Sequence, residues 1–283
     1  MKSVYSPSLQ LQFHPTYPCS DLQERILEIF SGNIKGTKPV QSSAYARVLA
    51  FDAPCRGERR LFFYKEFFFR NFRDRLSVLF RESRAKRAWT GACILTDHEL
   101  HTAMPVCLGE QRVLGIVKRS FLVTEGLPDA MEIEKYIKKY FSRNDDPKEV
   151  LGKRTFISQF GKTIGRMHRS GIFQGDLRER NVLVQEGDPQ KIYLIDNERT
   201  RRYARLPDRK RLKNLVQVNM NRSPVITLTD RLRFFLAYLE ENPGMKDMRR
   251  TWMKRILSKT QARLILKGRK FGSHKKQITE ICL

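Results

Sequence analysis

Apolar and polar residues follow two different patterns along the chain, with a change near residue 126. Before it, residues 45–51 and 61–69 are rich in apolar and aromatic side chains and flank a turn that contains Pro and Gly, which predicts two strands. Residues 121–125 predict a further strand, which ends in the chain breakers Glu125-Gly126-Leu127-Pro128, typical of a hinge. The first part of the chain is therefore predicted to be rich in β-structure.

Beyond residue 126 the apolar residues recur at helical spacing. Phe156, Phe160, Ile164 and Met167 form one apolar stripe, and residues 230–240 repeat the pattern. The prediction is an α+β chain in three parts. These are an N-terminal extension over residues 1–35, a β-rich lobe over residues 36–125, and a helical lobe with a basic C-terminal tail over residues 126–283.

The chain is strongly basic, with 55 Lys and Arg against 30 Asp and Glu and a net charge of +25. Such an excess predicts an anionic partner, but charge alone does not choose among nucleic acid, anionic lipids and nucleotides. The five Cys are scattered without a C-x-x-C pair, which predicts reduced thiols, no zinc site and a cytoplasmic setting. No apolar run is long enough to span a bilayer, so any membrane association is predicted to be peripheral.

The residues most typical of chemistry lie between positions 167 and 200. Asp176 and Asn181 are separated by four residues, and a short strand, a polar turn and a second apolar strand lead directly to Asp196. This order is typical of a phosphoryl-transfer catalytic loop followed by a metal-binding aspartate. We therefore predict that Asp176 is the catalytic base. Asn181 and Asp196 carry the hard oxygen ligands that Mg²⁺ prefers, and we predict that they bind it.

Basic residues near these motifs are candidates for phosphate contact. Lys65 lies in the middle of the apolar segment LFFYKEFFF, where burying a charge costs free energy unless it serves a purpose. Strand alternation also allows it to point outward, but the motif downstream favours contact with ATP phosphates. Arg178 and Arg180 flank the catalytic loop and are candidate contacts for an acceptor or a phosphate, with solvated surface as the alternative. His168 is predicted to be structural.

Six motifs carry a family resemblance, and they cover roughly residues 40 to 240. They are Y-K-E-F around Lys65, R-x-S-R-A-x-R-A-W from Arg81, S-F-L-V-T-E from Ser120, H-R-S-G-I-x-x-G-D-L-x-x-x-N from His168, I-D-N-E-R from Ile195 and D-R-L-R-F-x-x-A-Y-L from Asp230. In these features the sequence resembles the lipopolysaccharide kinase (Kdo/WaaP) family, a bacterial branch of the protein-kinase-like fold.

The resemblance implies a bilobal protein-kinase-like fold with a β-rich N-lobe and a helical C-lobe. It implies an ATP- and Mg²⁺-dependent enzyme that phosphorylates a heptose or Kdo hydroxyl in the inner core of lipopolysaccharide. The acceptor would be an anionic, lipid-linked sugar, met at the cytoplasmic face of the bacterial inner membrane. By position, Lys65 would contact the ATP phosphates. Residues 123–126, which include Glu125, would hold adenine through backbone groups.

The chain departs from the protein-kinase pattern around the lysine. No G-x-G-x-x-G precedes it, and the small residues Ser42 and Ser43 are the candidate phosphate loop in its place. The segment after Lys65 has no obvious glutamate partner for the lysine. Ala88 stands where related sequences often carry an acidic residue, and Glu82 is the nearest candidate.

Two other classes of function share these residues. A small atypical protein kinase would need an ordered activation segment, but residues 196–208 are few, rich in Arg and lack an A-P-E motif. A catalytically weak kinase-like binding protein is the other alternative, against which the retention of the lysine, base and metal-ligand candidates argues. The sequence has no recognisable nucleic-acid-binding motif, so a nucleic-acid partner is not predicted.

Overall fold

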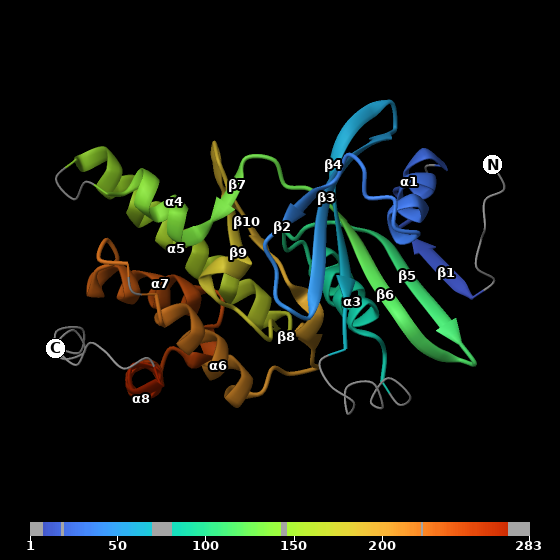
Figure 1. Cartoon of the computed structure of the whole chain (residues 1–283). Coiled ribbons are helices and arrows are strands. Elements are labelled where there is room, and N and C mark those ends of the chain that lie inside the picture. Colours follow the sequence, from blue (N-terminus) through green and yellow to red (C-terminus); the bar gives the residue numbers. More distant parts are fainter. Residues whose placement is uncertain (1–7, 18–19, 70–80, 143–145, 222, 271–283) are drawn as a thin grey trace. The chain divides into compact units, whose positions relative to one another are not determined.

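The computed structural model describes residues 8–17, 20–69, 81–142, 146–221 and 223–270, and the chain forms two compact units (Figure 1). The first unit comprises residues 1–97, 102–129 and 196–200, and the second comprises residues 98–101, 130–195 and 201–283. The short segment 196–200 belongs to the first unit, although the sequence analysis assigned it to the helical lobe. Its contacts with a helix of the first unit explain the difference, as described below.

The first unit is built on a six-stranded antiparallel sheet in the order β1-β5-β6-β4-β3-β2. The predicted strands are confirmed within β3, β4 and β6. The strands are β1 (Leu9–Phe13), β2 (Lys38–Val40), β3 (Ala46–Cys55), β4 (Glu58–Phe67), β5 (Pro105–Val113) and β6 (Ile116–Glu125).

Helix α1 (Ser20–Phe30) packs its apolar stripe on this sheet. Leu22, Ile26 and Ile29 are fully buried in one core with Phe62, Phe121 and other sheet residues. Each such side chain contributes roughly 1.5–3 kcal/mol by leaving water. Because β1 also pairs with β5, the described part of the N-terminal extension is an integral layer of the first unit.

Helix α3 (Arg84–Thr96) lies on the opposite face of the sheet. It packs Ala85, Ala88 and Trp89 against Leu108 and Leu122 in a second apolar cluster. Successive residues of a strand point to opposite faces. Leu122 therefore faces α3, while its neighbours on the strand face α1. The same alternation places Lys65 of β4 on the α3 face of the sheet, since it lies one residue from the α1-facing side chain of Tyr64.

The second unit is mainly helical, and the predicted helical stripe is confirmed within its longest helix. Helix α5 packs closely on α7: a Cβ added at Gly161 would lie 2.3 Å from the carbonyl oxygen of Phe234. The helices are α4 (Ile133–Tyr140), α5 (Pro147–Arg169), α6 (Asp208–Asn219), α7 (Leu228–Glu240) and α8 (Arg249–Lys270), and the strands are β7 (Ala130–Glu132), β8 (Ile172–Phe173), β9 (Val182–Gln185), β10 (Asp188–Leu194) and β11 (Arg201–Arg202).

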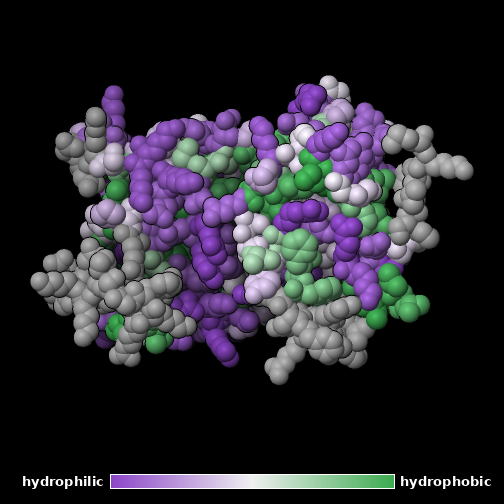
Figure 2. All heavy atoms as spheres, viewed as in Figure 1, coloured by the Kyte–Doolittle hydropathy of each residue, from purple (hydrophilic) through white to green (hydrophobic). Residues whose placement is uncertain are grey.

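Two small sheets position the loops of the second unit. Strands β10, β9 and β7 pair in that order, and β11 pairs with β8. The connection between β8 and β9 is the predicted catalytic loop. On the face shown in Figure 2, hydrophilic side chains cover much of the described surface, with smaller apolar areas among them.

Candidate active site

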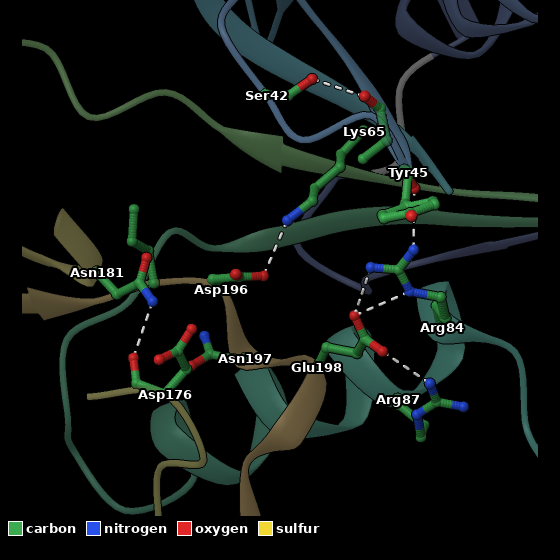
Figure 3. Close-up of polar contacts among 12 residues, drawn as sticks. Ser42, Tyr45, Lys65, Arg84, Arg87, Asp176, Asn181, Asp196, Asn197 and Glu198 are labelled. Carbon is green, nitrogen blue, oxygen red and sulfur yellow. Dashed lines mark hydrogen bonds and ion pairs between the residues drawn. The ribbon is translucent and has the colours of Figure 1, made fainter. Parts of the chain in front are cut away.

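The predicted ATP lysine is paired with the predicted metal-binding aspartate. Lys65 Nζ lies 2.9 Å from Asp196 Oδ1, and both residues belong to the first unit (Figure 3). Their side chains are 29% and 40% exposed, so the pair contributes little to the free energy of unfolding. An exposed ion pair on the sheet face is instead suited to meet a charged ligand.

A carboxylate clamp holds the segment that carries Asp196 against helix α3. Glu198 accepts hydrogen bonds from Arg84 Nε and Nη2 at 3.0 and 2.9 Å and from Arg87 Nη2 at 2.8 Å (Figure 3). Burial raises the pKa of the Glu198 carboxyl, but the hydrogen bonds and charges of the two guanidinium groups outweigh burial and lower that pKa below its usual range. Glu198 is therefore a fixed anion between two cations.

The backbone of the same segment makes a close contact with α3. A Cβ added at Gly91 would lie 2.2 Å from the carbonyl oxygen of Asn197, so only glycine permits this approach. The Asn197 amide donates to Thr102 Oγ1 at 2.8 Å. Asp196 itself has a left-handed backbone, with φ 59° and ψ 57°, a conformation that Asp tolerates better than most residues. The two residues that directly follow the lysine's partner are therefore anchored to α3 and to Thr102.

Glu82, the nearest candidate partner for the lysine in the sequence, does not pair with it. The Glu82 carboxylate lies 3.5 Å from Lys86 Nζ on the surface, and Lys65 pairs with Asp196. Ala88 faces the apolar core of the unit. The expected contact would have an acidic residue on the helix. In the structure α3 supplies two cations, and the segment that carries Asp196 supplies the anion.

Sequence reasoning assigned no role to Glu198, Arg84 or Arg87, although a signal was present. Arg84 and Arg87 stand three residues apart and so share one helix face, and Glu198 follows Asp196 by two residues. Nothing in the sequence pairs these groups before the fold is known. The ion pairs between Glu198 and the two arginines join residues that are more than 100 positions apart in the sequence.

In the second unit, Gln174 orients the predicted catalytic loop. It is fully buried, its Nε2 donates to the carbonyl oxygen of Ile195, and its Oε1 accepts from the backbone N–H of Asp176. The loop is entered through Gly171, whose φ is +76° and whose added Cβ would lie 2.1 Å from the carbonyl oxygen of Tyr203. Gln174 stands two residues before Asp176. Its side chain links the Asp176 backbone N–H to the carbonyl oxygen of Ile195.

The predicted base and one predicted metal ligand lie together in this loop. Asn181 Nδ2 donates to the carbonyl oxygen of Asp176 at 2.8 Å (Figure 3), and Asn181 is buried. The Asp176 carboxylate forms an ion pair with Arg178 Nε, while the Arg178 side chain is 56% exposed. Arg180 is exposed. That these two arginines contact the acceptor or a phosphate stays a prediction.

His168 is confirmed as a structural residue. It is buried, its Nδ1 lies 3.0 Å from the Tyr238 hydroxyl, and its Nε2 lies 3.1 Å from Asn214 Oδ1. The Asn214 amide nitrogen donates to the carbonyl oxygen of Gln174. Because Asn214 Oδ1 can only accept, the ring donates to it through Nε2. Burial, aided by the charge of Arg211, lowers the pKa of His168 to about 3.

The candidate phosphate loop closes on itself. Ser42 Oγ donates to the carbonyl oxygen of Ala46 at 2.6 Å, and the Ala46 N–H donates to the carbonyl oxygen of Ser43 at 3.0 Å. These bonds define a tight turn that leads into β3. The prediction that Ser42 and Ser43 contact phosphate stays a prediction.

The end of β6 is tied to the N-terminal segment. The Glu125 carboxylate accepts from the Tyr17 hydroxyl and lies 3.0 Å from Arg60 Nη1. Its backbone N–H donates to the carbonyl oxygen of Met104, and the next N–H, of Gly126, donates to that of Leu61. The segment predicted to hold adenine thus has a braced backbone, and its role stays a prediction.

The first unit carries a lysine–aspartate pair on a sheet and an anchored aspartate segment, and the second unit carries an Asp–Asn loop between two strands; each of these features is typical of the kinase-like class. The model of the lipopolysaccharide kinase (Kdo/WaaP) family matches residues 34–238, and the chain belongs to this family. The predicted family and the predicted protein-kinase-like fold, with a β-rich N-lobe and a helical C-lobe, are confirmed.

The sequence identity to individual relatives is low. The chain is 26% identical over 160 residues to the lipopolysaccharide core heptose(I) kinase WaaP of Escherichia coli, covering 54% of this chain and 59% of that protein. It is 24% identical over 193 residues to WaaP of Pseudomonas aeruginosa, covering 63% and 69%. A solved structure of WaaP in complex with acyl carrier protein is similar in fold, with 20% identity, coverage of 89% and 98%, and a TM-score of 0.63.

The buried histidine makes the free energy of unfolding depend on pH. In the unfolded chain His168 takes up a proton below about pH 6.5, whereas the folded protein resists protonation until its pKa of about 3. Stability from this group is therefore complete above pH 6.5 and falls with decreasing pH, by about 1.4 kcal/mol per pH unit between pH 6 and pH 4. Denaturant titrations across this range should show the slope in the wild type and lack it in His168→Gln. Equal slopes in the two proteins would contradict the assignment.

Proposed function

We propose that this protein is an ATP-dependent kinase that phosphorylates a sugar hydroxyl in the inner core of lipopolysaccharide. The observation that carries the proposal is the pair of Lys65 and Asp196 at 2.9 Å, on a segment clamped by Glu198. The relatives named above are heptose(I) kinases, which favours heptose over Kdo as the acceptor. The clamp keeps the Asp196 carboxylate beside the Lys65 ammonium, and we expect the phosphates of a nucleotide to bind next to this pair.

Each residue of the site has a separate role in this proposal. Lys65 contacts the phosphates of ATP and offsets their charge. Asp176 orients the acceptor hydroxyl and removes its proton as the oxygen attacks the γ-phosphorus. Gln174 keeps the Asp176 backbone in place through the 2.5 Å contact between its Oε1 and the Asp176 N–H. Arg178, beside the base, offsets negative charge on the incoming phosphoryl group.

The residues present suit Mg²⁺. Asp196 offers a carboxylate that is 40% exposed, and Asn181 offers an amide whose nitrogen is already committed to the carbonyl oxygen of Asp176. The carbonyl oxygen of that amide is therefore its metal-binding atom. A carboxylate and an amide oxygen are hard ligands of the kind Mg²⁺ prefers. When bound, the ion would offset charge on the nucleotide phosphates, and the two residues would hold it.

We also propose that the protein works peripherally at the cytoplasmic face of the inner membrane. Its acceptor is lipid-linked, and the net charge of +25 suits an anionic surface, where each Lys or Arg near the lipid contributes about 1 kcal/mol. None of the helices in the described residues is long and apolar enough to cross a membrane. Attraction by charge is the mode of contact that this composition supports.

An acyl carrier protein is the partner we propose for the second unit. A cavity of about 360 Å³ there is lined mainly by apolar side chains, most of them from α4, α5, α6, α7 and α8. Leu228, Leu232 and Leu257 line it and are 51%, 40% and 51% exposed, so an apolar edge reaches the surface. The related WaaP structure contains acyl carrier protein. An acyl chain is the ligand whose shape and polarity suit this cavity.

This cavity also reaches the catalytic loop. Leu177 and Arg178, which directly follow the proposed base, are among its lining residues. A chain bound here would therefore fill space under the loop and restrict its movement. Acyl binding is proposed to stabilise the active loop in addition to tethering the partner.

Replacing the base separates chemistry from nucleotide binding. Asp176→Asn keeps the size of the side chain but removes its basicity, so phosphate transfer from ATP to a purified core-lipid fraction should fall roughly 10³-fold, within the usual range for general-base catalysis. Asp188→Asn, a surface change that removes an ion pair with Lys191 and keeps the oxygen that accepts from the Gln190 N–H, should stay near wild type. Transfer by Asp176→Asn at the wild-type rate would overturn the role. Transfer to protein but not to core lipid would favour the atypical protein kinase.

Filling the apolar cavity tests the acyl partner. Val218→Trp places a large ring among the lining residues and should weaken binding of palmitoylated acyl carrier protein by about tenfold or more, since each methylene kept out of the cavity costs about 0.8 kcal/mol. The matched change Leu236→Trp lies on the exposed side of α7 and should have less than a twofold effect. Calorimetry with acylated and unacylated carrier measures both. Equal affinity for the two carrier forms would contradict the proposal, and an unfolding titration shows whether each variant is folded.

A further inference from the structure

A second cavity of the helical unit is lined by positive charge. Its volume is about 260 Å³, and it lies where α6 packs against α8. Within the described residues no Asp or Glu lines it. The lining residues are Arg209, Lys210, Lys213 and Val216 of α6, and Lys259 and Arg263 of α8.

This concentration of charge is unfavourable for the folded chain by itself. Lys259 and Arg263 stand four residues apart on α8, and like charges at this spacing repel each other. Arg209 and Lys210 lie in the first turn of α6, where the partial positive charge of the helix terminus adds to their own; Asp208 in the same turn offsets part of this charge but does not line the cavity. Five cations and a helix N-terminus around one cavity are stabilised together when an anion enters it.

The basic cavity is connected to the catalytic loop through one aromatic ring. The ammonium groups of Lys210 and Lys213 lie 4.8 and 5.2 Å from the centroid of the Phe173 ring. Phe173 is buried in β8 and stands three residues before Asp176. The two lysines therefore contact the strand that leads directly to the proposed base.

We propose that this cavity binds an oxyanion of the sugar acceptor, a phosphate or the carboxylate of a sugar acid, and so orients the acceptor toward Asp176. The inference rests on the proposed kinase function and adds the part of the site that selects the substrate. Arg263 suits an oxyanion because its planar guanidinium donates two parallel hydrogen bonds. Lys210 and Lys213 add positive charge beside β8, the strand that precedes the catalytic loop. The acceptor is recognised by its negative groups, while the hydroxyl beside them is the one phosphorylated.

Paired substitutions on one helix test this assignment. Lys259→Ala with Arg263→Ala removes two cations from the lining, and Arg250→Ala with Lys254→Ala removes two exposed cations with the same spacing from outside it. The first pair should raise the KM for the acceptor about tenfold or more, because two charge-assisted contacts are lost. The kcat at saturating acceptor and the KM for ATP should change less than twofold. The control pair should leave all three constants within twofold, and equal effects of both pairs would overturn the site.

Binding without ATP separates this inference from the kinase proposal. The probe is lipopolysaccharide from a strain whose inner core lacks phosphate, held in detergent micelles. Wild type should bind it about tenfold or more tightly than the Lys259/Arg263 variant, whether or not the protein transfers phosphate. An absence of transfer by wild type with this difference intact would refute the kinase and keep the anion site. Equal micelle binding by wild type and variant would refute the site.

Two further arms identify the source of the oxyanion. Removal of the lipid A phosphates from the probe should abolish the difference between wild type and variant if phosphate is bound. It should preserve the difference if a sugar carboxylate is bound, and either result supports the site. Vesicles of phosphatidylglycerol without the glycolipid should bind wild type and variant within twofold of each other. A loss of vesicle binding as large as the loss of glycolipid binding would show a membrane contact and overturn the acceptor site.

Discussion

The contact of Glu198 with Arg84 and Arg87 determines where the key carboxylate of the first unit lies. Asp196 is exposed and has a left-handed backbone, so it needs an anchor nearby to stay beside Lys65. The buried Glu198 carboxylate supplies that anchor, with hydrogen bonds of 2.8 to 3.0 Å to α3. Loss of either partner would leave a buried charge uncompensated, which is strongly destabilising. The lysine–aspartate pair thus depends on a salt bridge that involves neither of its own two side chains.

In the second unit, neutral hydrogen-bonding groups hold the predicted catalytic loop in place. His168, Asn214 and Gln174 form a chain of hydrogen bonds from the core to the catalytic loop. Each member is buried and satisfied, which makes such a network rigid. The loop therefore presents Asp176 from a fixed backbone, while the residues around it carry the charge. The apolar cavity is lined in part by Leu177 and Arg178, and two lysines of the basic cavity lie over the Phe173 ring, so both cavities adjoin residues next to this loop.

Local patterns predicted much of this architecture, because strand alternation and helical spacing are visible in the residues themselves. The strands around Lys65 and the order of Asp176, Asn181 and Asp196 are examples. The partner of Lys65 could not be predicted and Glu82 was only the nearest candidate, since an ion pair between distant residues depends on the tertiary fold. The packing of the N-terminal helix on the sheet was likewise not predictable from its stripe alone, which shows that a face is buried but not against what. The roles of all the candidate site residues stay predictions: Ser42, Ser43, Lys65, Glu125, Asp176, Arg178, Arg180, Asn181 and Asp196.

The most direct test of the account is calorimetry of ATP binding, with and without Mg²⁺, by the wild type and Asp196→Ala. If Lys65 and Asp196 form the nucleotide-binding half of a kinase site, the wild type binds ATP in a Mg²⁺-dependent way. The variant then loses that dependence, because the carboxylate that holds the ion is gone. Mg²⁺-dependent binding of equal affinity in both proteins would contradict the account. So would an absence of ATP binding by the wild type, which would leave a kinase-shaped protein whose basic cavity is its binding site.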